Sequence, residues 1–172
     1  MTAMMARPVA RALAAALLTM ATAACSGSGA GNDTAAGGSA ATDPNTRVPV
    51  TITGAAGAHV FLVEHAVTAA QQAQGLMYRT DLKPDGGMLF HPYPADGSAP
   101  REASFWMKNT PTPLDILFIR ADGTIATIAE NTVPYSSAEV KSREPVAAVL
   151  ELVGGRTAEL GIAEGDRVTW PR

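Results

Sequence analysis

The sequence predicts a mainly β domain, a mostly antiparallel sandwich or barrel that carries two short α-helices. From residue 47 onward, short apolar runs recur to the end of the chain, most of them bounded by Gly, Pro or Asp. Tight-turn signals such as Ala121-Asp122-Gly123 separate some of these runs. Helical periodicity occurs in only two places. The three observations together favour strands over helices as the framework.

The expected strands follow the apolar and alternating segments in chain order. They are residues 48–53, 60–63, 87–90, 104–108, 115–120, 124–129, 146–153 and 167–170. Asp122 and Gly123 would form a hairpin turn between two of them, and 164–166 a second turn before the last.

Two short helices interrupt the strands. Thr68 and Gln71 match a capping box, in which each side chain binds the backbone N–H of the other residue. Apolar residues follow at helical spacing as far as Met77, so the first helix is expected to begin after Thr68. The second helix covers about 155–160 and ends at Gly161, which suits a left-handed C-cap.

Residues 1–24 have the features of a removable signal peptide. Arg7 and Arg11 form a positive beginning, and the 13 residues 12–24 carry no charge. A transmembrane helix needs about 20 apolar residues, so this run is too short to span a membrane. We therefore expect export to the cell envelope.

Cys25 is the expected lipid attachment site. Ala23 and Ala24 before it resemble the sequence cut by lipoprotein signal peptidases, whereas Thr22 departs from the usual Leu. The alternative is ordinary secretion with cleavage after Ala23. Residues 26–46 hold no large apolar side chain, so 25–46 is expected to be a lipidated cysteine followed by a disordered tether.

Residues 47–172 form a single expected domain, large enough to bury a core without disulfides. Cys25 is the only cysteine, which excludes an internal disulfide and a thiolate metal cluster. The net charge is −3 and basic residues are scattered singly, so nucleic acid is not an expected partner.

Several sequence blocks resemble one known family. They are residues 74–79 (Gln-Gly-Leu-Met-Tyr-Arg), 87–90 (Gly-Met-Leu-Phe), 104–110 (Ser-Phe-Trp-Met-Lys-Asn-Thr), 113–119 (Pro-Leu-Asp-Ile-Leu-Phe-Ile) and 158–166. Over about 60–172 the chain is similar to the bacterial and archaeal domain of unknown function 192 family. The resemblance implies a compact, mainly β fold, often behind a signal or lipoprotein signal, and no established activity. Members often carry a cysteine after the strand matching 124–130; residues 131–137 have none here, so a role for a thiol there is excluded.

The strongest candidate for a binding site is formed by Trp106, Lys108, Asn109 and Asp115. A strand over 104–108 would place Trp106 and Lys108 on one face, and the following turn would return Asp115 towards them. Such a wall suits a sugar, a peptide or a small polar ligand. The alternative is structural, with Asp115 paired to Lys108 or capping the turn.

Glu151 is a second candidate because it interrupts an apolar run. Turned inward, it would pair with Arg79 or Lys108 or have a raised pKa; turned outward, it would be solvated. An enzyme of unrecognised type would use Asp115 and Glu151 as acid and base with Lys108 as electrostatic partner.

A Cu(I) site is a weaker alternative. Met77, Met88, Met107 and His91 offer thioether and imidazole ligands, but no clustered spacing, and methionines also fill apolar cores. We therefore expect no resident metal or cofactor. The leading interpretation is a non-catalytic, membrane-tethered envelope domain that binds a small polar ligand, a glycan or an envelope protein.

The lipid anchor is directly testable. Replacing Cys25 by Ser removes the only thiol, so the protein should move from the membrane fraction to the soluble fraction while the domain keeps its fold. Fractionation of cells that express the two forms measures this. A Cys25→Ser protein that stays with the membranes would contradict the anchor.

Overall fold

The computed structural model describes residues 47–171, and the predicted signal peptide and tether lie outside them. The described elements are β1 (Arg47–Gly54), β2 (Gly57–Ala66), α1 (Ala69–Gln74), β3 (Gly87–Phe90), β4 (Arg101–Phe105), β5 (Leu114–Ile119), β6 (Ile125–Ala129), β7 (Val140–Val146), β8 (Ala148–Val153), α2 (Arg156–Leu160) and β9 (Arg167–Thr169). Neither helix in this part of the chain is long and apolar enough to cross a bilayer.

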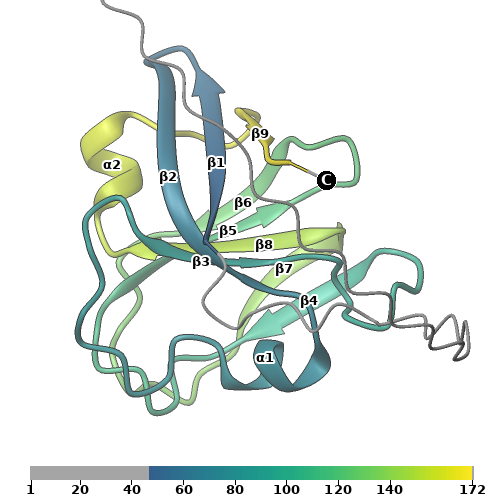
Figure 1. The fold of residues 1–172 in the computed structure, drawn as a ribbon, viewed down its shortest axis with the longest axis vertical. Coiled ribbons are helices and arrows are strands. Elements are labelled where there is room, and N and C mark those ends of the chain that lie inside the picture. The colour runs from purple at the N-terminus through teal and green to yellow at the C-terminus, as the bar shows by residue number, and fades with distance from the viewer. Residues whose placement is uncertain (1–46, 172) are drawn as a thin grey trace, which may run out of the picture. The chain divides into compact units, whose positions relative to one another are not determined.

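Seven strands form one strongly curved sheet in the order β6-β5-β8-β3-β2-β1-β9 (Figure 1). All its pairs are antiparallel except β2 with β3. The two outer strands approach each other: Ile125 N–H donates to the Asp166 carbonyl at 2.9 Å, and Val168 N–H donates to the Gly123 carbonyl at 2.8 Å. The predicted mainly β fold is confirmed, as a nearly closed, barrel-like sheet with two short helices.

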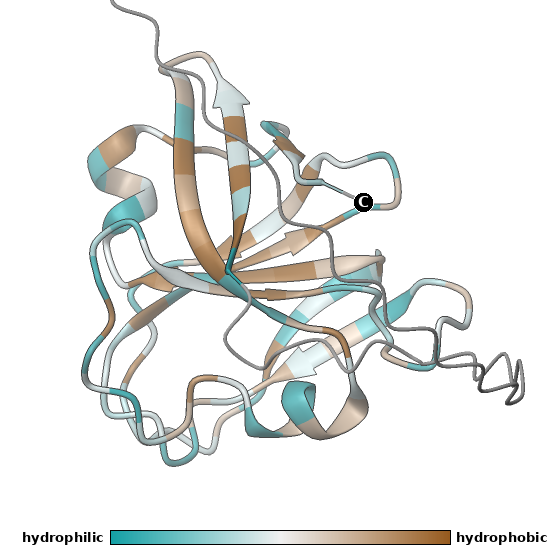
Figure 2. Cartoon of the chain, viewed as in Figure 1, coloured by the Kyte–Doolittle hydropathy of each residue, from teal (hydrophilic) through white to brown (hydrophobic). Residues whose placement is uncertain are grey.

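The central strands β5 and β8 are covered on both faces. Alternate residues of β5 enter two separate apolar clusters: Leu117 and Ile119 pack in one, and Ile116 and Phe118 in the other. Figure 2 shows β8 apolar along most of its length, whereas β4 and β7 carry hydrophilic residues. A strand covered on both sides reads as a continuous apolar run, which is the pattern of residues 114–119.

The small sheet formed by β4 and β7 covers part of the second cluster. Phe105 at the end of β4 packs edge-on against Phe90 and Phe118, with ring centroids 5.1 and 6.0 Å apart. These contacts join the two sheets through aromatic packing.

The strand predictions differ from the structure in two places. The strand expected over 104–108 runs instead over Arg101–Phe105, because the chain turns at Lys108 and Asn109. The strand expected over 146–153 is present as β8 (Ala148–Val153), but β7 (Val140–Val146) before it was missed. The inward position of β7 is occupied by Ser142, which accepts a hydrogen bond from Ala103 N–H at 2.9 Å, so no apolar alternation marks it.

The helix signals are confirmed at both helices. Thr68 and Gln71 form the expected capping box of α1. Gly161 ends α2 in the left-handed region, with φ of 65°. The adjoining Ile162 is buried and packs into the first apolar cluster.

Asp115 joins three parts of the chain. Its Oδ1 accepts hydrogen bonds from the backbone N–H groups of Asn131 and Gly155 at 2.7 and 2.8 Å. Its Oδ2 accepts from the backbone N–H and the hydroxyl of Thr157 at 2.8 and 2.7 Å. Gly155 is the N-cap of α2 and has no capping side chain, so Asp115 supplies that function from a distant strand. The expected pairing of Asp115 with Lys108 was wrong; this side chain is fully buried.

Removing this carboxylate should destabilise the fold severely. Asp115→Ala leaves buried donors unpaired, so the free energy of unfolding should fall by about 3–5 kcal/mol. Asp96→Ala is the matched control, since that exposed carboxylate accepts only from Ser98 in its own turn; this substitution should lower the free energy of unfolding far less. Urea unfolding measures both. Equal losses would show that the buried network contributes little.

Candidate functional site

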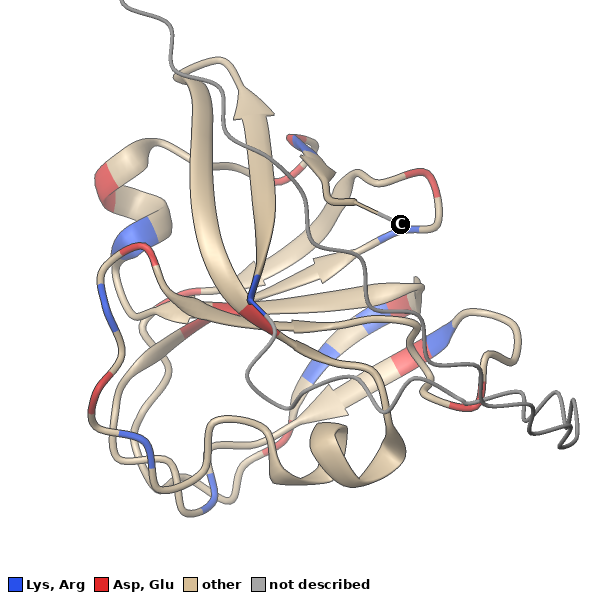
Figure 3. Cartoon of the chain, viewed as in Figure 1, with Lys and Arg blue, Asp and Glu red and all other residues tan. Residues whose placement is uncertain are grey.

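A groove with a volume of about 370 Å³ lies between α1, the loop that follows it and one face of β2 and β3. Its lining residues are Glu64, Ala70, Gln71, Gln74, Gly75, Met77, Arg79 and Met88. Thioethers provide the apolar part of this surface, and amide and charged groups provide the polar part. Figure 3 shows acidic and basic residues interspersed over the domain in this view, so the groove is defined by its contacts rather than by a patch of one charge.

A row of side chains crosses the sheet at the groove. Strand register pairs Glu64 with Met88, Met88 with Glu151, and Glu151 with Ile116. Paired residues of neighbouring strands project from the same face, so the four side chains share one face, with Met88 between the two carboxyl groups. Two strand spacings separate the backbones of Glu64 and Glu151 by about 10 Å.

Arg79 forms one wall of the groove. Its guanidinium donates to both carboxylate oxygens of Glu64, at 2.9 and 3.0 Å. It also donates to both oxygens of Asp81, at 2.7 and 3.1 Å, and these bonds hold the pKa of Asp81 below its usual value. The expected pairing of Arg79 with Glu151 was therefore wrong, because Arg79 binds these two other carboxylates.

Glu151 is buried without a partner. The side chain lies in the central strand β8, the residue is 4% exposed, and Oε2 has no hydrogen bond. Burial raises its pKa to about 8, so the carboxyl holds its proton at neutral pH. The sequence left open whether Glu151 is turned inward with a raised pKa or turned outward into solvent. The structure agrees with the inward position and the raised pKa, and the solvated position is wrong.

The acid–base pair of the enzyme alternative is not assembled. Glu151 lies opposite Ile116 in the strand register, and Asp115 lies opposite Leu152. Neighbouring residues of a strand point to opposite faces, so Asp115 and Glu151 project from opposite sides of the sheet. They cannot act on one substrate bond.

Trp106 and Lys108 lie outside the groove. Both follow the end of β4, and the Lys108 ammonium lies 5.5 Å from the centre of the Trp106 ring. Asn109 makes the connection to the groove, where its amide donates to the Met77 sulfur at 3.9 Å. Of the predicted binding residues, Arg79 and Asn109 are thus at the groove, Glu151 lies next to its Met88 wall, and Asp115 is elsewhere in the fold.

The four residues of the Cu(I) alternative do not converge. Met77 and Met88 share the groove, but Met107 is buried in the core. His91 lines a different cavity. No group of three or more His, Cys, Asp and Glu residues within 47–171 is arranged to hold a metal.

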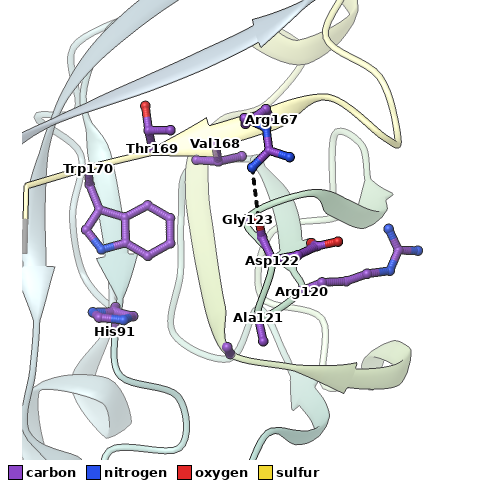
Figure 4. Close-up of a pocket in the computed structure, with 10 residues that line it drawn as sticks. His91, Arg120, Ala121, Asp122, Gly123, Arg167, Val168, Thr169 and Trp170 are labelled. Carbon is purple, nitrogen blue, oxygen red and sulfur yellow. Dashed lines mark hydrogen bonds between the residues drawn. The ribbon is translucent and has the colours of Figure 1, made fainter.

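That second cavity, of about 190 Å³, lies where the sheet nearly closes (Figure 4). The Arg167 guanidinium donates to the Asp122 carbonyl at 2.9 Å, and the rings of His91 and Trp170 meet edge-on at 5.0 Å. These contacts hold the hairpin after β5 against β9. Of the predicted site residues it contains only His91, so the groove is the better candidate site.

Sequence reasoning missed several groove residues. Glu64, Gln71 and Gln74 come together only through the α1 and β2 geometry, and the capping box was the sole signal at Gln71. No local pattern marks Glu64, because its position is set by register with Met88.

Comparisons with known proteins identify relatives but no activity. Residues 50–170 match the model of the DUF192 family, described as uncharacterized ACR. A crystal structure of a proposed transcription regulator from Sinorhizobium meliloti 1021 is 49% identical, with a TM-score of 0.67, and the match covers 73% of this chain and 94% of that one. A protein of unknown function from Novosphingobium aromaticivorans DSM 12444 is 46% identical, with a TM-score of 0.69, over 82% of this chain and 100% of that one. No curated protein matches the chain.

The raised pKa of Glu151 predicts a specific pH dependence of stability. Between the usual value of 4.5 and about 8, the folded chain binds a proton that the unfolded chain releases. The free energy of unfolding therefore falls as pH rises through this window, by up to about 1.4 kcal/mol per pH unit. Glu151→Gln keeps the shape without an ionisable group, so its stability relative to the native sequence should increase by several kcal/mol from about pH 5 to pH 8.

Urea unfolding at several pH values measures this difference. Glu159→Gln, which removes an exposed carboxylate of α2, is the matched control for the chemical change. Parallel pH profiles for Glu151→Gln and the native sequence would show that Glu151 ionises normally in the fold.

Proposed function

Since the chain belongs to the DUF192 family, whose members are uncharacterised, we propose its function from its own residues: it is an exported, lipid-anchored domain that binds a small polar ligand with an apolar portion in the groove. Export and anchoring rest on the signal-like residues 1–24 and on Cys25, which lie outside the described structure. The ligand site rests on the geometry around Met88.

The observation that carries the proposal is the cross-strand row Glu64, Met88 and Glu151. An open groove of about 370 Å³ lies directly beside an unpartnered carboxyl whose pKa is raised by burial. Titratable groups perturbed in this way occur at functional sites more often than elsewhere, and cavities with a few convergent polar groups are the usual ligand sites.

The chemistry of the lining defines the ligand class. The Oε1 atom of Gln71 accepts the N–H groups of Val67 and Thr68 and the Thr68 hydroxyl, which leaves the amide NH₂ group for a ligand acceptor. Met77 and Met88 offer polarisable apolar contact. A ligand with hydroxyl or carbonyl groups on one side and a carbon skeleton on the other fits this surface; single sugars, amino acids and short peptides have that character.

The arrangement of the polar side chains favours ligand binding over catalysis. Arg79 holds Glu64 by two hydrogen bonds, and Asp115 faces away from Glu151. The acid–base pair considered for Asp115 and Glu151 needs both carboxyl groups directed at one substrate. The groove residues are instead arranged to recognise and retain a ligand.

Filling the groove should abolish binding. Ala70 and Ala73 are both exposed alanines of α1, but only Ala70 is among the lining residues, so Ala70→Trp blocks the groove and Ala73→Trp is its matched control. Amide NMR shifts during titration with a panel of monosaccharides, amino acids and dipeptides identify a binder through Gln71, Gln74 and Arg79. Ala70→Trp should weaken that binder about tenfold or more, and Ala73→Trp should not. Shifts confined to residues outside the groove, or equal affinity in both variants, would contradict the proposal.

A further inference from the structure

Three neighbouring loops expose a cluster of large apolar side chains, termed here the loop tip. It consists of Tyr78, Trp106, Val133 and Tyr135, which are 69, 50, 70 and 66% exposed, together with Lys108 over the Trp106 ring. These four are most of the six exposed large hydrophobic side chains in residues 47–171. The loops after α1, β4 and β6 that carry them gather at the lower left of Figure 1.

The backbone fixes the three loops to one another. Tyr78 N–H donates to the Asn109 carbonyl at 2.8 Å, and Tyr135 N–H donates to the Thr110 carbonyl at 3.1 Å. Met107 N–H donates to the Ser136 carbonyl at 3.0 Å. The exposed rings are therefore presented from a pre-formed surface.

That surface is held in an unfavourable conformation. Tyr78, Asn109 and Tyr135 have φ of 63°, 59° and 60°. Left-handed backbone is uncommon for residues other than Gly and is unfavourable for a bulky side chain such as Tyr, whereas Asn adopts it more readily. Strain that the surrounding structure maintains, together with exposed aromatic rings, indicates a surface with a partner.

The chain outside the structure joins the domain at Arg47, beside the groove. Arg47 begins β1 and pairs in register with Glu64, which binds Arg79, the residue after Tyr78. Arg47 and Arg79 also line one small cavity together. Only residues 26–46 separate the expected anchor at Cys25 from Arg47, so an anchor there would keep the domain near the bilayer.

We infer that the loop tip docks on the lipid bilayer that holds the Cys25 anchor, with Tyr78, Trp106 and Tyr135 in the interfacial region and Lys108 at the headgroups. This inference rests on the lipid anchor of the proposed function. Trp and Tyr favour the membrane–water interface because their rings are apolar and their N–H or O–H groups stay hydrated. The Lys108 ammonium lies over the Trp106 ring, so a positive charge sits beside this ring where the headgroups would be. Docking adds a second contact to a single attachment point and sets the orientation of the groove relative to the membrane.

Two tryptophans make the inference measurable. Trp106 and Trp170 are the only ones in the chain, and Trp170 lies in the second cavity, away from the loop tip. The chain from Cys25 onward is coupled through its single thiol to vesicles of phosphatidylcholine and phosphatidylglycerol that carry a maleimide lipid. Brominated phosphatidylcholine then quenches a tryptophan that reaches the interface. In Trp170→Phe, fluorescence from Trp106 should fall about twofold; in Trp106→Phe, that from Trp170 should hardly change.

Replacing the flanking rings gives the second readout. Tyr78→Ser with Tyr135→Ser, in the Trp170→Phe background, should remove most of the quenching of Trp106. Val60→Ser, an equally exposed apolar position on β2, should leave it unchanged. Because the coupling is chemical, absence of lipidation in cells does not affect the result and is detected separately by fractionation.

Either of two results would overturn the inference. One is quenching of Trp106 no stronger than that of Trp170. The other is unchanged quenching in the double tyrosine variant. Capture of an envelope protein through the loop tip, with Trp106 unquenched, would assign this surface to a protein partner instead.

Discussion

The four hydrogen bonds accepted by Asp115 are the constraint on which the loops around β5 depend. They fix the start of β5 to Asn131 and to the first turn of α2. Thr132 N–H adds a bond to the Leu114 carbonyl at 2.8 Å, so the loop carrying Val133 and Tyr135 leaves the sheet in a defined direction. The same loop then holds the backbone of Met107 and Thr110. A single buried carboxylate thus supports a surface to which it contributes no atoms.

Asp115 and Glu151 show that the effect of a buried carboxyl group depends on the hydrogen-bond donors around it. Asp115 and Glu151 lie in adjacent strands, and both are almost inaccessible to solvent. Asp115 is surrounded by donors and stabilises the fold, whereas Oε2 of Glu151 has no donor and burial raises the pKa of that carboxyl. Burying a polar group without a hydrogen bond costs free energy, so Glu151 lowers the stability that Asp115 raises.

The sequence predicts those parts of the fold whose signals are local. The capping box at Thr68, the C-cap at Gly161 and the continuous apolar run of β5 each depend on residues close together in the chain. Strand β7 was missed because its inward residue is Ser142, and its stability comes from contact with β4 rather than from its own pattern. The partners of Asp115 lie up to 42 residues away, and no spacing rule identifies them.

For the candidate site, too, local contacts were predicted from the sequence and contacts between distant segments were not. Trp106 and Lys108 are near neighbours in the chain and were correctly brought together, although through a turn rather than a strand. The pairing of Glu64 with Arg79 and the row that ends at Glu151 depend on sheet register between distant segments, so they were not predicted. The left-handed conformations of Tyr78 and Tyr135 carry no sequence signal at all, since Tyr is not a residue that favours positive φ. That conformation matters at Tyr78 because the next residue, Arg79, binds Glu64 at the groove while Tyr78 itself is exposed. The left-handed conformation at Tyr78 therefore lets one loop contribute Tyr78 to the loop tip and Arg79 to the wall of the groove.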